Sequence, residues 1–183
     1  MLRRFAAISA LALSASAASA QPTATLPSGF TFVDWLTVNN ATVGAGALDD
    51  RNVVYFLKEK QIGNLQSWLI FFDPGGTQAV IGTVSFQQAI ANIFTSSADV
   101  NTTSAAYRLT PPVTYAGVAN TGLEAGDAAS FLGNNLSFDW NASDPGDHVR
   151  VLTTTVPEPS TYAMLFVGFG AISLAARRRR HNA

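Results

Sequence analysis

Few side chains in this sequence could act as catalysts or as soft metal ligands. Cysteine is absent, so no disulfide, thiolate metal site or cysteine nucleophile can form. His148 is the only histidine before the C-terminal tail; it could pair with Asp139 or Asp147, but one histidine is too few for a zinc site. No Gly-x-Ser-x-Gly, His-Glu-x-x-His or phosphate-loop pattern occurs. We therefore expect a protein that is not an enzyme.

Carboxylates are the remaining candidates, and they gather in two short stretches. Asp49 and Asp50 adjoin a glycine loop, and Asp139, Asp144 and Asp147 surround a later turn. Carboxylate oxygens on loops are the ligands that calcium prefers. Aspartate is also a common turn residue because its side chain bonds nearby backbone amides. The sequence therefore leaves calcium binding open at these acids and predicts no other cofactor.

Tryptophans could contact a carbohydrate by stacking on it. Trp68 and Trp140 lie within apolar strand patterns and are expected in the core. Trp35, beside Asp34, has no such pattern around it. It is the residue that the sequence offers for a sugar contact.

The charge of the central region limits the choice of partners. Charged residues make up only 13% of the 183 residues, which is about half the usual share. Between residues 21 and 155, five basic and eleven acidic side chains give a net charge of −6. An acidic surface argues against nucleic-acid binding but is compatible with cations and neutral glycans.

Short apolar runs separated by turns dominate the central region and predict β-strands. The clearest runs are residues 53–57, 67–72, 80–86, 128–132 and 136–140. The last two flank Gly133-Asn134, which predicts a hairpin. Residues 96–103 are polar and are expected to form a loop, whereas residues 87–94 fit either a helix or a strand.

Alternation within two segments predicts which side chains face inward. Residues 136, 138 and 140 are Leu, Phe and Trp, with polar residues between them. Val149 and Val151 are expected to face the core, and His148 and Arg150 the solvent. Strands at roughly ten-residue spacing without a long helical period predict an all-β fold, an antiparallel β-sandwich of the jelly-roll type over residues 21–155.

The first twenty residues have the three parts of a secretory signal peptide. Two arginines at positions 3 and 4 precede an apolar stretch, and Ala18-Ser19-Ala20 forms a small-x-small cleavage site. We expect signal peptidase to cut after Ala20 and the Sec translocon to export the chain, leaving Gln21 as the mature N-terminus.

Residues 156–183 have the organisation of a membrane-sorting tail. Pro157 and Pro159 interrupt the chain, and residues 161–176 form a short apolar stretch expected to be a transmembrane helix. The basic tail 177–183 begins with Arg177, Arg178, Arg179 and Arg180, which should stop transfer and stay in the cytoplasm. The apolar stretch is short for a permanent anchor, which suits a segment that is held briefly and then cut.

The combination of Pro157-Glu158-Pro159-Ser160-Thr161, a short hydrophobic helix and a terminal arginine cluster resembles the PEP-CTERM sorting signal of Gram-negative bacteria. The resemblance covers only about the last 27 residues. It implies processing by an exosortase, a membrane-embedded transpeptidase-like enzyme, which would recognise Glu158 and the prolines. It also implies a bacterium that makes extracellular polysaccharide. An ordinary single-pass tail anchor is the alternative.

The central region also resembles the β-rich ectodomains that often precede such tails. Residues 68–74, 122–124 and 144–151 carry this likeness. Those ectodomains have no settled activity, so the likeness implies fold and location rather than function.

Together these observations predict an exported protein of the cell envelope or extracellular matrix. We expect it to cross the inner membrane, to be anchored there transiently, and then to remain periplasmic, at the cell surface or secreted. Its expected role is structural or adhesive and is linked to exopolysaccharide or biofilm. A calcium-dependent or carbohydrate-binding, lectin-like module is the alternative.

Overall fold

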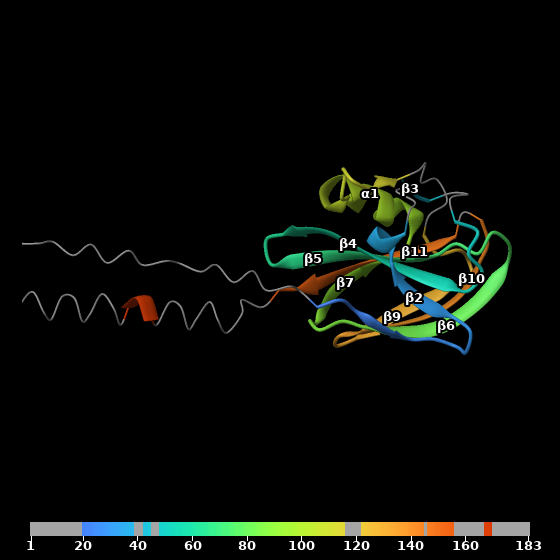
Figure 1. The fold of residues 1–183 in the computed structure, drawn as a ribbon, viewed down its shortest axis with the longest axis horizontal. Helices are drawn as coiled ribbons and strands as arrows, with labels where there is room; N and C mark the ends of the chain where they lie inside the picture. Colours follow the sequence, from blue (N-terminus) through green and yellow to red (C-terminus); the bar gives the residue numbers. More distant parts are fainter. Residues whose placement is uncertain are drawn as a thin grey trace, which may run out of the picture. The chain divides into compact units, whose positions relative to one another are not determined.

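The structure, a computed structural model, describes six segments of the chain, residues 20–38, 42–44, 48–115, 122–144, 146–155 and 167–169 (Figure 1). Residues 20–156 form one compact unit, which we call the body. Apart from Ala20 and residues 167–169, the predicted signal peptide, sorting motif, anchor and arginine cluster lie outside the described residues. Within the described segments, no helix has the length and apolarity needed to cross a membrane.

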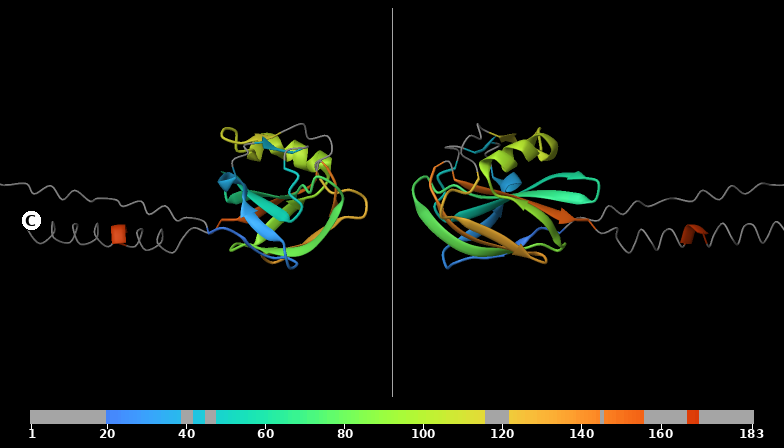
Figure 2. Two further views of the ribbon diagram at one scale, coloured as in Figure 1. Left: turned by 45° about the vertical axis from the view of Figure 1, so that its right-hand side comes forward. Right: turned by 180° about the vertical axis from the view of Figure 1, so that it is seen from behind.

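Two sheets make up most of the body (Figures 1 and 2). The four-stranded sheet has the order β1-β6-β10-β9, with bounds Thr23–Thr25, Gln78–Ser85, Asn135–Ala142 and Ala128–Leu132. The five-stranded sheet has the order β2-β4-β5-β11-β7, with bounds Thr31–Asp34, Val53–Ile62, Leu65–Phe72, Asp147–Thr154 and Ile90–Phe94. A third pair joins β3 (Thr42–Val43) to β8 (Thr114–Tyr115). The predicted mostly-β fold is confirmed.

Most strand pairs are antiparallel, but β2 pairs with β4 in parallel, and so does β3 with β8. The predicted antiparallel pairing therefore holds for most strand pairs but not for these two. Two short helices also interrupt the β-structure, the 3-10 turn η1 (Trp35–Thr37) and α1 (Ser97–Tyr107). Residues 87–94, which the sequence left open, supply the strand β7.

Side chains of both large sheets meet in one core. Leu136, Phe138 and Trp140 of β10 pack there with Trp68 of β5 and Val149 of β11, among others. The alternation predicted for β10 is confirmed, because its apolar residues are buried while those between them are exposed. The hairpin predicted between β9 and β10 is also confirmed.

The five-stranded sheet is covered on its other face as well. A second core joins Tyr55, Leu57, Leu69 and Phe71 of this sheet to Val100 of α1. Consequently β5 and β11 are buried along almost their whole length, on both faces. Alternation along a strand indicates which side chains are buried only when one face of the sheet is exposed to solvent. The prediction that His148 and Arg150 of β11 face the solvent was therefore wrong.

Helix α1 was predicted as a loop because its residues are mainly Ser, Thr, Asn and Ala. Its start is fixed by Ser96, whose Oγ accepts a hydrogen bond from Asp99 N at 3.1 Å and donates one to Asp99 Oδ2 at 2.7 Å. Only Val100 and Ser104 of the helix are buried. The helix therefore depends on the sheet beneath it, and a hydrophobic pattern could not reveal it.

Candidate functional site

A buried ion pair joins β11 to β4. Arg150 Nε donates to Glu59 Oε2 at 2.7 Å, and Arg150 Nη2 donates to Glu59 Oε1 at 3.0 Å. Neither side chain is exposed to solvent. The two parallel hydrogen bonds form the bidentate geometry in which arginine and carboxylate interact most strongly. Glu59 and Lys60 lie where the β4–β5 pairing shifts register, with two β4 residues opposite one on β5, as in a β-bulge.

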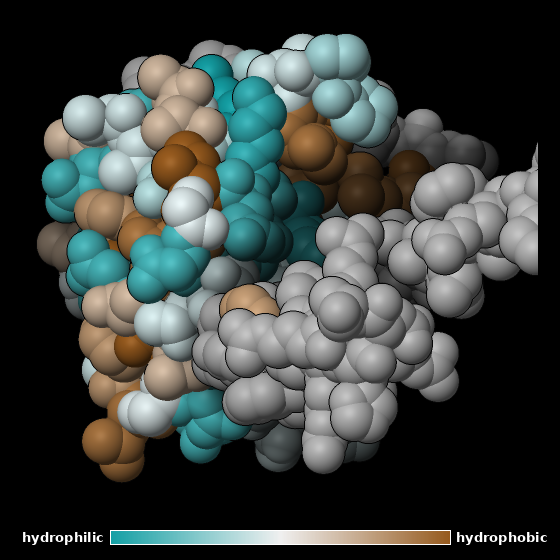
Figure 3. Space-filling model, turned by 90° about the vertical axis from the view of Figure 1, so that its left-hand side faces the viewer, coloured by the Kyte–Doolittle hydropathy of each residue, from teal (hydrophilic) through white to brown (hydrophobic). Residues whose placement is uncertain are grey.

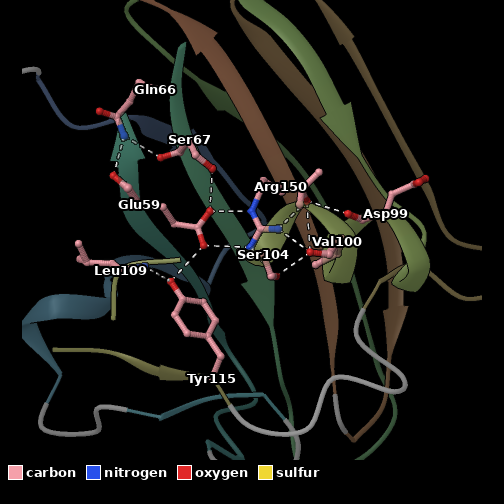
Figure 4. Close-up of polar contacts among 10 residues, drawn as sticks. Glu59, Gln66, Ser67, Asp99, Val100, Ser104, Leu109, Tyr115 and Arg150 are labelled. Carbon is pink, nitrogen blue, oxygen red and sulfur yellow. Dashed lines mark hydrogen bonds and ion pairs between the residues drawn. The ribbon is translucent and has the colours of Figure 1, made fainter. Parts of the chain in front are cut away.

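The guanidinium also holds helix α1 against the sheet (Figure 4). Arg150 Nη1 donates to the backbone oxygen of Val100 and to Thr103 Oγ1, the latter at 2.7 Å. Arg150 Nη2 donates to Ser104 Oγ at 3.1 Å. One arginine therefore bonds three residues within about one turn of α1 as well as Glu59.

The carboxylate of Glu59 is bonded on its other side by two hydroxyls. Ser67 Oγ donates to Glu59 Oε2 at 2.7 Å, and Tyr115 Oη donates to Glu59 Oε1 at 3.0 Å. Tyr115 Oη also accepts from Leu109 N at 3.1 Å. Burial, followed by the charge of Glu59, raises the pKa of Tyr115, so its hydroxyl keeps the proton that it donates. The network thus connects β4, β5, β8, β11 and α1.

A cavity of about 10 Å³ lies beside this network, lined in part by Ser104, Tyr115, His148 and Arg150. That volume is room for about one water molecule. Among the residues that the structure describes, the charged groups of this network are bonded to one another, and the cavity beside them is small. What this arrangement can do chemically is to lock the helix onto the sheet.

His148 lies in this buried layer and not on the surface, where the sequence placed it. It is 1% exposed, and its ring stacks on Phe71 with centroids 5.3 Å apart and planes 7° from parallel. Burial lowers the pKa of His148 to about 4, and the nearby charge of Arg150 acts in the same direction. At neutral pH the imidazole is therefore uncharged.

Asp73 is a buried acid that the sequence analysis did not single out. It interacts electrostatically with two of the candidate calcium ligands, Asp49 and Asp144. It follows β5 directly and is 2% exposed. Burial, together with the charges of Asp144 and Asp49, raises the pKa of Asp73 to about 6. Its position immediately after a fully apolar run was the signal that could have identified it.

Asp147 is also buried, but its acidic neighbours are different residues. Burial, together with the charges of Asp127 and Glu124, raises the pKa of Asp147 to about 7. Asp50 Oδ2 accepts a hydrogen bond from the Tyr55 hydroxyl at 2.5 Å. Asp139 is exposed in the middle of β10.

The five predicted calcium ligands are thus not brought together as one set. In the part of the chain that the structure describes, no group of three His, Cys, Asp or Glu side chains is placed to hold a metal ion. Trp35, the tryptophan that the sequence left open as a sugar contact, is 1% exposed and packs edge-on against Tyr55 and Phe71, so it is a core residue. Trp68 and Trp140 are core residues, as predicted.

Asp147 should make the stability of the body depend on pH. Its pKa is raised in the folded state, so between about pH 4 and pH 7 the folded chain holds a proton that the unfolded chain releases, and stability falls as pH rises through this window. Asp147→Asn stays neutral at every pH. We therefore expect its free energy of unfolding to rise relative to that of the wild type by on the order of 2 kcal/mol when the pH is raised from about 5 to about 8. Urea unfolding at both pH values measures this.

Two comparisons make the pH measurement specific. His148 has a lowered pKa, so it costs stability as pH falls from about 6.5 to 4, but it does so in both proteins and cancels in their difference. The exposed Asp139→Asn is the matched control and should show the same difference from wild type at both pH values. A difference for Asp147→Asn that does not grow with pH would contradict the prediction.

The predicted sorting residues Pro157, Glu158, Pro159, Ser160 and Thr161 lie outside the described residues. The family described as the PEP-CTERM protein-sorting motif matches residues 155–180 of the chain. The chain carries a PEP-CTERM sorting motif. This confirms the resemblance seen in the sequence. No curated protein and no solved structure matches the chain.

The PEP-CTERM motif begins where the body ends. β11 closes at Thr154, and Thr155, the first residue of the match, donates its backbone N–H to Asn64 O at 2.7 Å. The motif implies export, anchoring through the C-terminal segment and processing by an exosortase. The functional residues of this chain therefore belong to two separate parts, a sorting tail and a folded β-rich body.

Proposed function

We propose that this chain is a non-enzymatic structural or adhesive protein of the cell envelope or extracellular matrix, exported and then sorted by an exosortase. The observation that carries the proposal is the PEP-CTERM motif at residues 155–180, which directly follows a β-rich body. The exosortase is the partner that the motif implies, and it would recognise Glu158 and the adjoining prolines.

The export route is the second part of the proposal. Residues 1–20 would act as a signal peptide read by the Sec translocon, and signal peptidase would cut after Ala20. That cut would leave every strand of the body intact, since β1 begins at Thr23. The inner membrane would hold the apolar stretch of residues 161–176 until the exosortase acts.

The body would serve as a stable scaffold. Two sheets that share one core support a β-sandwich of the jelly-roll type, and the buried network around Arg150 adds a locked helix to it. These buried polar groups are bonded to one another, which favours a structural role over a catalytic one. The link to extracellular polysaccharide and biofilm rests on the biology that the PEP-CTERM resemblance implies.

A calcium-dependent or carbohydrate-binding module is the second candidate. Its support is the raised pKa of Asp73 beside Asp49 and Asp144, because a cation there would relieve the repulsion. The described residues offer no ready set of three ligands, so calcium would have to draw on backbone oxygens. A rise in the melting temperature of residues 21–155 at millimolar calcium would favour this candidate.

Replacing Glu158 tests the sorting function. In the native host, we expect Glu158→Ala to abolish C-terminal trimming while the chain still inserts into the membrane, because the exosortase would lose its recognition residue. Intact-mass analysis of the cell and medium fractions measures both chain ends at once. Glu124→Ala, the same change at an exposed position of the body, should be processed like the wild type.

A truncation separates anchoring from recognition. A chain that lacks residues 161–183 should appear in the periplasm or medium without ever fractionating with membranes. Unchanged membrane association of this truncation would refute anchoring, and normal trimming of the Glu158→Ala chain would refute the role of Glu158.

A further inference from the structure

The turn between β4 and β5 lies beside the point where the body passes into the sorting tail. Thr154 pairs with Leu65 at the start of β5, and Thr155 N donates to Asn64 O. Both ends of the body leave it on this side (Figures 1 and 2). Figure 3 looks onto this face, where hydrophilic side chains run beside hydrophobic ones. We call residues 58–65 the tether-side hairpin.

The length of the tail keeps this hairpin close to the membrane. The chain advances by seven residue steps from Thr155 to Tyr162, which is the second residue of the apolar stretch of residues 161–176. A chain of that length spans at most about 25 Å when fully extended. Strand β5, from Leu65 to Phe72, is itself about 25 Å long. With the apolar stretch in a bilayer, the tether-side hairpin must therefore lie near the lipid surface.

Positive charge gathers at this hairpin. Lys60 is exposed, and Lys58 lies 5.8 Å above the ring of Trp68. Arg108 lies 4.8 Å above the ring of Tyr115, whose hydroxyl bonds Glu59 between the two lysines. Glu59 is buried in its pair with Arg150 and presents no charge to solvent. Three of the four cations that the described body leaves unburied thus lie on this side.

Negative charge gathers at the opposite end of the same strands. Asp147 pairs with Phe72, Asp73 follows that residue, and Asp50 N donates to Asp73 O at 3.1 Å. Electrostatic coupling adds further acids to this group, which we call the acidic end: Asp49, Asp50, Asp73, Glu124, Asp127, Asp144 and Asp147. The body is therefore a charge dipole along β4, β5 and β11.

We propose that the tether-side hairpin docks on the anionic lipid headgroups of the membrane that holds the PEP-CTERM tail. This inference rests on the proposed anchoring. Lys58 and Lys60 face the headgroup phosphates, and Ile62, which is 44% exposed, enters the interface between headgroups and acyl chains. The acidic end is repelled by the same surface and points away from it. The body is thus held in one orientation.

The absence of cysteine makes the orientation measurable, because a single introduced cysteine carries a unique fluorescent label. The chain from Gln21 to Ala183 is reconstituted into phosphatidylcholine nanodiscs with or without phosphatidylglycerol, and with a headgroup-labelled quencher lipid. Labels are placed at Gln61→Cys in the hairpin and at Thr77→Cys, which is exposed at the acidic end. We expect strong quenching at position 61 and little at position 77, and only with phosphatidylglycerol.

A matched pair of charge reversals tests the cause. Lys60→Glu and Arg51→Glu change the charge equally, but Arg51 follows Asp50 at the acidic end. Lysines near an anionic surface contribute roughly fivefold each to binding. We therefore expect Lys60→Glu to reduce the quenching at position 61 severalfold or more, and Arg51→Glu to leave it unchanged. High salt, where the Debye length falls to about 3 Å, should also release the hairpin.

The outcomes separate this inference from the proposed anchoring. A chain that does not co-elute with nanodiscs has no anchor, which overturns both. A chain that co-elutes but shows equal quenching at positions 61 and 77, or quenching that needs no anionic lipid, overturns the docking alone. Equal effects of Lys60→Glu and Arg51→Glu would do the same, since attraction would then depend on net charge and not on the hairpin.

Discussion

Arg150→Met is expected to lower the free energy of unfolding of the body by about 3–5 kcal/mol, the cost typical of breaking a buried ion pair. Methionine fills most of the volume of the arginine stem but leaves Glu59 without its two strongest hydrogen bonds. Glu59 is fully buried and cannot turn to water. Helix α1 would lose its three bonds to the guanidinium in the same step. Urea unfolding of residues 21–155 measures the change.

A double variant shows which part of this loss of stability comes from leaving the charge of Glu59 buried without a partner. Glu59→Gln with Arg150→Met removes both charges. Ser67 and Tyr115 donate to different oxygens of Glu59, so the single amide oxygen of Gln keeps one of these bonds and its NH2 group can donate to the other hydroxyl. We expect the double variant to be more stable than Arg150→Met alone, because no unpaired charge stays buried. Arg108→Met is the matched control: Arg108 stacks on Tyr115 outside the ion pair and should cost about 1 kcal/mol or less. A similar loss for both arginines would contradict the role of the pair.

The strands were predictable because their signals are local. β10 alternates apolar and polar residues, and Gly133-Asn134 specifies the hairpin that joins it to β9. Both features depend on residues adjacent in sequence, and one face of this sheet is exposed. The positions of Trp68 and Trp140 in the core follow from the same patterns.

The buried hydrogen-bond network around Arg150 was not predictable, because it depends on which element covers the second face of the five-stranded sheet. Arg150 and His148 occupy positions that are outward in a half-exposed strand, and helix α1 turns that face into an interior. The sequence of α1 is too polar to signal a buried helix. An arginine and a glutamate separated by 91 positions also carry no local sign that they pair.

The sorting motif was predictable for the opposite reason. It is a short linear pattern, and the family match covers the same stretch that the pattern indicated, while the roles of its single residues stay predictions. The acidic residues show the limit of such reasoning. Asp49 and Asp144 were identified as candidates, but Asp73 was not. The charges of both residues raise the pKa of Asp73, yet it belongs to a turn that looks ordinary in sequence.

Gly146→Ala is expected to destabilise the body by about 2–4 kcal/mol, with contributions from the left-handed backbone and from overpacking. Gly146 has a φ of +81°, and a Cβ there would lie 2.5 Å from the backbone oxygen of Phe72 and 2.8 Å from Asp73 Cβ. The neighbouring atoms belong to the end of β5 and cannot rotate away. The turn also carries the carbonyl that bonds His148 Nδ1. Thermal and urea unfolding measure the loss.

Gly133→Ala is the matched control for this substitution. Gly133 has a similar φ of +62°, but nothing lies within 4 Å of an added Cβ in its turn. We expect it to cost about 1 kcal/mol, which is the backbone contribution alone. The difference between the two variants therefore isolates the contact with β5. That contact packs the turn before β11 against Asp73. Its loss should expose Asp73 to solvent and so lower its raised pKa. Equal losses for the two glycines would show that the turn can move away from the strand.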